Sequence, residues 1–153
     1  MKTIIISPWS RDLRDGKLNA KNYGSWPELV VLLRQNGYKT IQVGVTNEKL
    51  IGADEVKFNL PLSDLADLIK SCDLWISVDN FINHYASYLG KRGIALWGVS
   101  DPKIFGYEKN INLLKSRSYL RPDQFGFWEG VPYNKEAFVE PEVVLKQVEK
   151  FSS

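Results

Sequence analysis

The sequence predicts an α/β fold, a single Rossmann-like, doubly wound parallel sheet with helices on both faces. Short, continuously apolar runs such as 4–6 and 74–78 are typical of strands that are covered on both faces. Segments with apolar residues at helical spacing separate these runs, so strands and helices alternate along the chain. The 153 residues are 44% hydrophobic and 25% charged, which suits one globular domain. With no internal repeat or linker in view, residues 1–153 are expected to form a single domain.

The first strand and the first helix are separated by a long polar loop. Residues 2–6 contain three consecutive isoleucines and predict the first strand. A helix should begin at Ser25, which can act as its cap, with Pro27 in the first turn and Glu28 placed for a capping box. Gly37 should end this helix in the left-handed conformation.

The remaining elements follow in the same alternating order. Further strands are predicted at 39–44, 55–58, 74–78 and 93–97, with a weaker one at 111–114. A helix over 62–72 should be capped by Ser63 or a neighbour, and one over 82–89 should end at Gly90. A C-terminal helix should start at Pro141 and bury four apolar side chains: Val143, Val144, Val148 and Phe151.

Composition narrows the function classes. The net charge of +2 is too small to indicate nucleic acid or an anionic membrane as a partner. Cys72 is the single cysteine, so neither an intramolecular disulfide nor a cysteine-based zinc site can form. The apolar stretch at the N-terminus is too short for a signal peptide or a membrane span, which makes the cytosol the default location. No phosphate-loop, dinucleotide or metalloprotease motif occurs, and we expect no cofactor and no bound metal.

The turn at Asp79 is the most informative candidate site. It follows a buried strand and precedes a helix that starts at Asn80 and Phe81. Free N–H groups and the positive dipole end of a helix make an anion site suited to phosphate, and His84 lies about one turn further on. Two plainer interpretations stay open: Asp79 could be an ordinary helix cap, and His84 could be a packed side chain.

This part of the chain resembles the heptosyltransferases and related family-nine glycosyltransferases. Their pattern is an aspartate after an apolar strand, a histidine five residues later, an L-G-K turn, another apolar strand and G-x-(S/T)-D-P. The matching residues are Asp79, His84, Leu89, Gly90, Lys91, Gly98, Ser100, Asp101 and Pro102. Upstream, Lys21 precedes a W-P helix start at Trp26 and Pro27, so the resemblance covers nearly the whole chain.

The resemblance implies the C-terminal, donor-binding half of a GT-B fold, which holds a nucleotide-diphosphate sugar. Asp79 would contact the sugar or pyrophosphate region, and His84 would reach the same phosphates. The N–H groups of Asn80, Phe81 and Ile82 would hold phosphate.

The resemblance assigns three further residues to the donor. Lys21 would neutralise the charge of the diphosphate leaving group. Glu48 would take the ribose hydroxyls, and Leu60 would line the base through its main chain. The family has a small residue and a glycine where this chain has Asn80 and Phe81, which puts close approach of a phosphate to the backbone in question.

Members of the family also have an N-terminal half that carries the acceptor site and a catalytic carboxylate, and this chain corresponds to the second half. Three interpretations follow: a glycosyltransferase that works with a second chain, a binding module without transfer, and an interaction protein that keeps only the fold. The sequence does not single out a catalytic base. Asp12 and Asp15 lie in a suitable loop, but their spacing is not diagnostic.

The segment 115–133 interleaves basic and aromatic residues. Such a mixture can stack bases or bind an acceptor or a partner protein, although the net charge does not support nucleic acid. The plainer alternative is that the aromatic side chains pack back on the domain. Exposed aromatics would indicate that the chain does not work alone, most simply as a homodimer or another homo-oligomer.

Overall fold

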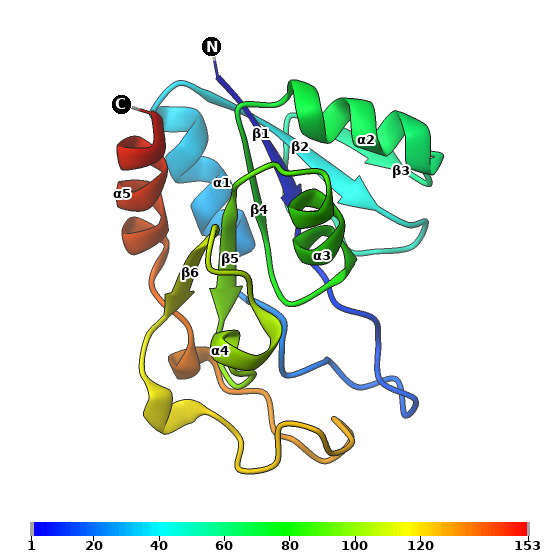
Figure 1. The fold of residues 1–153 in the computed structure, drawn as a ribbon, viewed down its shortest axis with the longest axis vertical. Helices are drawn as coiled ribbons and strands as arrows, with labels where there is room; N and C mark the ends of the chain where they lie inside the picture. The colour runs from blue at the N-terminus through cyan, green and yellow to red at the C-terminus, as the bar shows by residue number, and fades with distance from the viewer. Residues whose placement is uncertain (1, 153) are drawn as a thin grey trace.

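The computed structural model describes residues 2–152, and its centre is one fully parallel six-stranded sheet (Figure 1). The strands are β1 (Lys2–Ser7), β2 (Tyr38–Gly44), β3 (Glu55–Phe58), β4 (Leu74–Ser77), β5 (Ile94–Trp97) and β6 (Ile111–Leu114). They lie in the order β3-β2-β1-β4-β5-β6, and every neighbouring pair is parallel. Each strand falls on a predicted segment, so the predicted fold class is confirmed.

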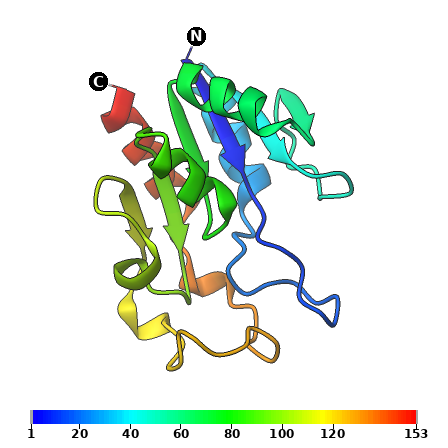
Figure 2. The same ribbon diagram turned by 45° about the vertical axis from the view of Figure 1, so that its right-hand side comes forward.

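Helices cover both faces of the sheet (Figures 1 and 2). The helices α1 (Trp26–Gln35) and α5 (Pro141–Ser152) lie on one face, and α2 (Leu62–Ser71) and α3 (Phe81–Tyr88) lie on the other. The pleat of β1 serves both layers, because Ile4 and Ile6 pack with α1 and α5 while Ile5 packs with α2 and α3. This two-sided burial explains the uninterrupted isoleucine run.

The predicted helix ends are partly correct. Gly37 and Gly90 have φ angles of +86° and +78°, so both end their helices in the left-handed region as expected. Ser25 is the N-cap residue of α1, but its side chain makes no capping hydrogen bond. Ser63 does not cap α2: the N-cap residue is Pro61, two positions earlier, which has no side-chain acceptor.

Helix α5 buries fewer apolar side chains than the sequence pattern predicts. Val144 and Val148 are fully buried, as their spacing of four residues requires, and Phe151 packs partly against the core. Val143 is 37% exposed, so its predicted place on the buried side is wrong. Adjacent positions in a helix point about 100° apart, and Val144 occupies the buried direction.

Between β5 and α5 the chain forms short elements that the sequence pattern did not reveal. They are the helix α4 (Pro102–Phe105) and the 3₁₀ turns η1 (Arg117–Tyr119) and η2 (Lys135–Ala137). We call residues 115–133 the strap, since it runs along the carboxyl edge of the sheet before the chain turns back to α5 (Figure 2). Across residues 2–152, no helix is both long and apolar enough to cross a membrane.

Candidate functional site

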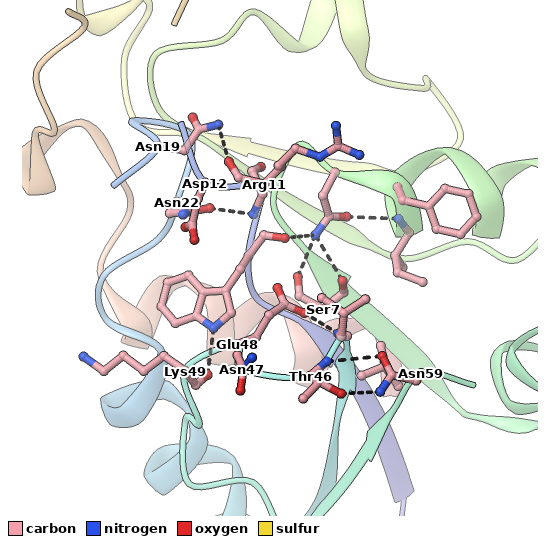
Figure 3. Close-up of a pocket in the computed structure, with 18 of the residues that line it drawn as sticks. Ser7, Arg11, Asp12, Asn19, Asn22, Thr46, Asn47, Glu48, Lys49 and Asn59 are labelled. Atoms are coloured by element: carbon pink, nitrogen blue, oxygen red, sulfur yellow. Dashed lines mark hydrogen bonds between the residues drawn. The ribbon is translucent and has the colours of Figure 1, made fainter. Parts of the chain in front are cut away.

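The strand order places a topological switch point between β1 and β4. From β1 the chain proceeds to β2 on one side and only later to β4 on the other, so the loops at their carboxyl ends diverge. A cleft of about 980 Å³ opens there, lined by the loops that follow β1, β2, β3 and β4. Figure 3 shows Asn19 and Asn22 at one end of this cleft and Thr46 and Asn59 at the other, with Glu48 between them.

The cleft gathers six of the seven predicted site residues from four separate loops. These are Lys21, Glu48, Leu60, Asp79, Asn80 and Phe81. The seventh, His84, is not part of the lining but lies beside it, with its Nε2 atom 4.0 Å from Oδ1 of Asp79. The residues therefore converge at one place, although their roles toward a ligand stay predictions.

Asn80 is the N-cap residue of α3 and ties this helix to the loop after β1. Its Oδ1 accepts a hydrogen bond from the N–H of Ile82 at 3.0 Å. Its Nδ2 donates to the carbonyl oxygen of Ser7 at 3.1 Å and to that of Trp9 at 3.3 Å. The alternative in which Asp79 caps the helix is therefore wrong, and the carboxylate of Asp79 is available for another partner.

That partner is Lys21. The ammonium of Lys21 lies 3.3 Å from Oδ2 of Asp79, and the two side chains are 21% and 8% exposed. The main-chain oxygen of Asp79 accepts a 2.6 Å hydrogen bond from the hydroxyl of Ser10. A positive group thus stands at the Asp79 turn, on a side chain that comes from the loop after β1.

His84 is not a packed core side chain, since it is 49% exposed. Its Nδ1 atom lies 2.8 Å from the hydroxyl of Tyr107, and the two rings meet edge to face. The alternative of a buried structural histidine is therefore wrong. Tyr107 holds the ring of His84 through this contact, and no local sequence pattern pairs the two residues because they lie 23 positions apart.

The α3 N-terminus offers fewer free donors than expected. The N–H of Ile82 already donates to Asn80, whereas those of Asn80 and Phe81 have no acceptor within residues 2–152. The Phe81 ring stacks on Tyr85 one turn further along α3, with centroids 5.1 Å apart, and is 56% exposed. Two of the three predicted N–H groups are thus available to an anion.

Glu48 closes the turn after β2. Its Oε1 accepts a hydrogen bond from the N–H of Val45 at 2.6 Å. A Cβ atom at Gly44 would lie 2.0 Å from that oxygen, so the glycine makes room for the carboxylate. Burial raises the pKa of Glu48, the Val45 hydrogen bond opposes this, and the nearby charge of Asp12 raises it further.

The end of the cleft at Asn59 has an apolar wall. Leu60, Leu62 and Leu65 line it between β3 and α2. Asn59 has a φ angle of +59°, and its amide exchanges hydrogen bonds with the main chain and hydroxyl of Thr46. The sequence analysis missed this pair. The available signal was an asparagine directly after a short strand, since asparagine adopts the left-handed conformation more readily than most residues.

Asp101, which is part of the G-x-(S/T)-D-P motif, forms an ion pair with Arg117 of the strap. Both its oxygens accept hydrogen bonds from the guanidinium of Arg117, at 3.0 and 2.8 Å. One of them also caps α4 through the N–H of Lys103. The Arg117 hydrogen bonds lower the pKa of Asp101.

Some aromatic side chains of the strap pack back on the domain, and others are exposed to solvent. Tyr119 and Trp128 pack partly against the core, whereas Phe125 and Phe127 are 78% and 74% exposed. Within residues 2–152 the structure shows no group of three or more histidine, cysteine or acidic side chains that could hold a metal ion.

Comparison with known proteins places this fold and cleft in context. The model of glycosyltransferase family 9 (heptosyltransferase) matches residues 13–124. The solved structure of ADP-heptose LPS heptosyltransferase II from E. coli is 18% identical with a TM-score of 0.71, covering 98% of this chain and 46% of that one. The E. coli heptosyltransferase WaaC with ADP is also 18% identical, with a TM-score of 0.66 and coverage of 98% and 44%.

A third structure has a similar fold. The dodecameric iron-containing heptosyltransferase TibC from enterotoxigenic E. coli, in complex with ADP-D-β-D-heptose, is 17% identical with a TM-score of 0.70, covering 99% of this chain and 45% of that one. No curated protein matches in sequence. The chain spans less than half the length of these three structures, which match its whole α/β layer. Since the family model covers most of the chain, the protein belongs to glycosyltransferase family 9, the heptosyltransferase family.

Proposed function

We propose that the cleft binds a nucleotide-diphosphate sugar and that the chain transfers the sugar with the help of a second chain that holds the acceptor. The observation that carries the proposal is the convergence of six predicted donor-binding residues on one cleft at the switch point. Family membership supports glycosyltransferase-type chemistry.

The charge distribution suggests the direction of the ligand. A diphosphate would lie at the Asp79 turn, between the ammonium of Lys21 and the free N–H groups of Asn80 and Phe81. The nucleoside would extend toward Glu48 and the leucine wall at Leu60. His84, which lies beside the Asp79 turn, would reach the same phosphates. The related WaaC and TibC structures contain ADP and ADP-heptose, so ADP-linked sugars are the first ligands to test.

A second candidate is a binding module that does not transfer. Three carboxylates line the cleft, at Asp12, Glu48 and Asp79. Glu48 accepts from Val45 and Asp79 pairs with Lys21, so a general base would come from Asp12, from His84 beside the cleft, or from a second chain. A cytosolic location and a homo-oligomeric state remain predictions of the sequence.

A panel of ADP, UDP, GDP, CMP and their sugars in a thermal-shift assay tests the proposed site. A ligand at a hundred times its Kd should stabilise the chain by about 2.7 kcal/mol. Lys21→Ala should reduce the shift for diphosphates more than for nucleosides, and Asp79→Ala and His84→Ala should each reduce it.

Lys17→Ala is the matched control, because Lys17 lies in the same loop, is 78% exposed and pairs with Asp15 outside the cleft lining. Its shift should equal that of the unsubstituted chain. Unchanged shifts in all three site variants, with every nucleotide that binds, would place the ligand elsewhere.

A further inference from the structure

The strap is fastened by hydrogen bonds to the main chain of the loop that follows β5. The N–H of Arg121 donates to the carbonyl oxygen of Val99 at 3.0 Å, and Nε2 of Gln124 donates to the same oxygen at 2.9 Å. The N–H of Asp101 in turn donates to Oε1 of Gln124 at 2.9 Å. These bonds, with the Arg117–Asp101 pair, fix the strap next to the loop that carries Lys21.

Trp128 is the strap residue that meets Lys21. The ammonium of Lys21 lies 4.8 Å from the centroid of the Trp128 ring, and the guanidinium carbon of Arg121 lies 4.0 Å from the same centroid. Both distances are within the range of a cation–π interaction, which tryptophan supports best among the aromatic residues. Trp128 is itself partly buried against the core, and this packing holds its ring in place.

Lys21 is therefore held from two directions, by the carboxylate of Asp79 and by the ring of Trp128. A lysine side chain has a flexible four-carbon stem, and an unrestrained ammonium would spread over many positions. The ammonium has three donors, and Asp79 is its one ionic partner within residues 2–152. The ring restrains the group without using up a hydrogen bond, which leaves donors for an anion.

We infer that Trp128 is a positioning residue that holds the Lys21 ammonium at the cleft for the diphosphate of the ligand. The inference rests on the proposed function for the identity of the ligand. It makes the strap part of the binding site, although neither Trp128 nor Arg121 lines the cleft. Loss of the ring should weaken diphosphate binding and leave the nucleoside contacts unchanged.

The first test measures Lys21 without any ligand. In the NMR spectrum of the full chain, the ε-CH₂ protons of Lys21 should be shifted by the Trp128 ring current. Trp128→Leu should abolish that shift, and Trp128→Phe should keep part of it. Phe127→Leu is the matched control, because the Phe127 ring lies on the same strap but contacts Arg14. An unchanged Lys21 signal in Trp128→Leu would overturn the inference whatever ligand the chain binds.

The second test compares a nucleoside diphosphate with its nucleoside by calorimetry. Trp128→Leu should weaken the diphosphate about fivefold and the nucleoside less than about twofold, while Trp128→Phe should restore most of the affinity. In a Lys21→Ala background, Trp128→Leu should have no further effect on the diphosphate. Equal losses for both ligands, or an undiminished loss in that background, would show a structural role only. If the unsubstituted chain binds no nucleotide, the proposed function fails, and the NMR result still decides whether Trp128 positions Lys21.

Discussion

At the start of α3, Asn80 caps the helix and Asp79 pairs with a cation, so the two functions belong to different residues. A capping carboxylate would be occupied by backbone N–H groups, whereas here the amide of Asn80 caps α3 and Asp79 pairs with Lys21. The family pattern has a small residue where Asn80 stands. The larger amide reaches back to Ser7 and Trp9 and fixes the loop after β1. At this site, the departure from the pattern adds hydrogen bonds between α3 and the loop after β1.

Glu48 leads to a prediction about pH. Its pKa is raised in the folded chain, so the unfolded chain releases this proton at lower pH and the ionised form disfavours folding. The penalty is absent below the ordinary glutamate pKa of about 4.3 and is complete above the raised value. Glu48→Gln keeps an acceptor for Val45 and removes the penalty. The Tm of the variant relative to the unsubstituted chain should therefore rise as the pH increases above the ordinary glutamate pKa and should level off above the raised value.

Thermal unfolding of both proteins across this range checks the sign. Glu136→Gln is a suitable control, because Glu136 is 77% exposed and far along the chain from the cleft. A Tm difference for Glu48→Gln that falls as pH rises would contradict the assignment of a partly buried, destabilising charge at this turn.

At the scale of elements, the ion pair of Arg117 with Asp101 is one of several contacts that fasten the strap. Asp101 is 10% exposed and holds both oxygens against Arg117, so Arg117→Gln leaves a mostly buried carboxylate without its cation. Hydrogen exchange of the strap amides, including the Arg121 N–H bonded to Val99, should accelerate in the variant. Because the folded pKa of Asp101 is lowered, the pair stabilises above the ordinary aspartate range and is lost as pH falls through the lowered value.

Mass-spectrometric hydrogen exchange of both proteins at neutral pH measures this effect. Lys115→Gln serves for comparison, because Lys115 pairs with the more exposed Glu140 at the start of the strap. Exchange in residues 115–133 that matches the unsubstituted chain would show that the pair does not hold the strap.

The elements differ in how far the sequence determined them. The central strands β1, β4 and β5 follow from local composition, because each is a mainly apolar run between polar turns, and the predicted positions of all six strands are correct. The side chains of α5 that face the core depend on where the sheet lies, and the pattern alone could not separate Val143 from Val144. Contacts such as Lys21 with Trp128 or His84 with Tyr107 join residues far apart in the chain. Their prediction needs the folded strap and α4, which have no periodic signal.

The arrangement of the whole molecule explains why the residues of the cleft can be predicted from the sequence. In a parallel sheet the loops at the carboxyl ends lie on one edge, so residues that follow strands are brought together whatever their order. The order β3-β2-β1-β4-β5-β6 then selects the loops after β1 and β4 as the centre of the cleft. Residues 2–152 form one α/β layer, which corresponds to less than half of each related structure.

This arrangement predicts that the 153-residue chain on its own binds a nucleotide donor yet transfers its sugar poorly. Transfer needs the acceptor held against the donor, and such positioning can supply roughly 7–11 kcal/mol of the barrier in favourable cases. The related structures have a further half of their chains beyond the region that matches this one. Donor hydrolysis and sugar transfer should be assayed on the purified chain with and without candidate partner chains, next to a calorimetric measurement of donor binding. Robust transfer by the chain alone would contradict the prediction, and loss of that activity in Asp12→Asn would then identify Asp12 as the base within the cleft.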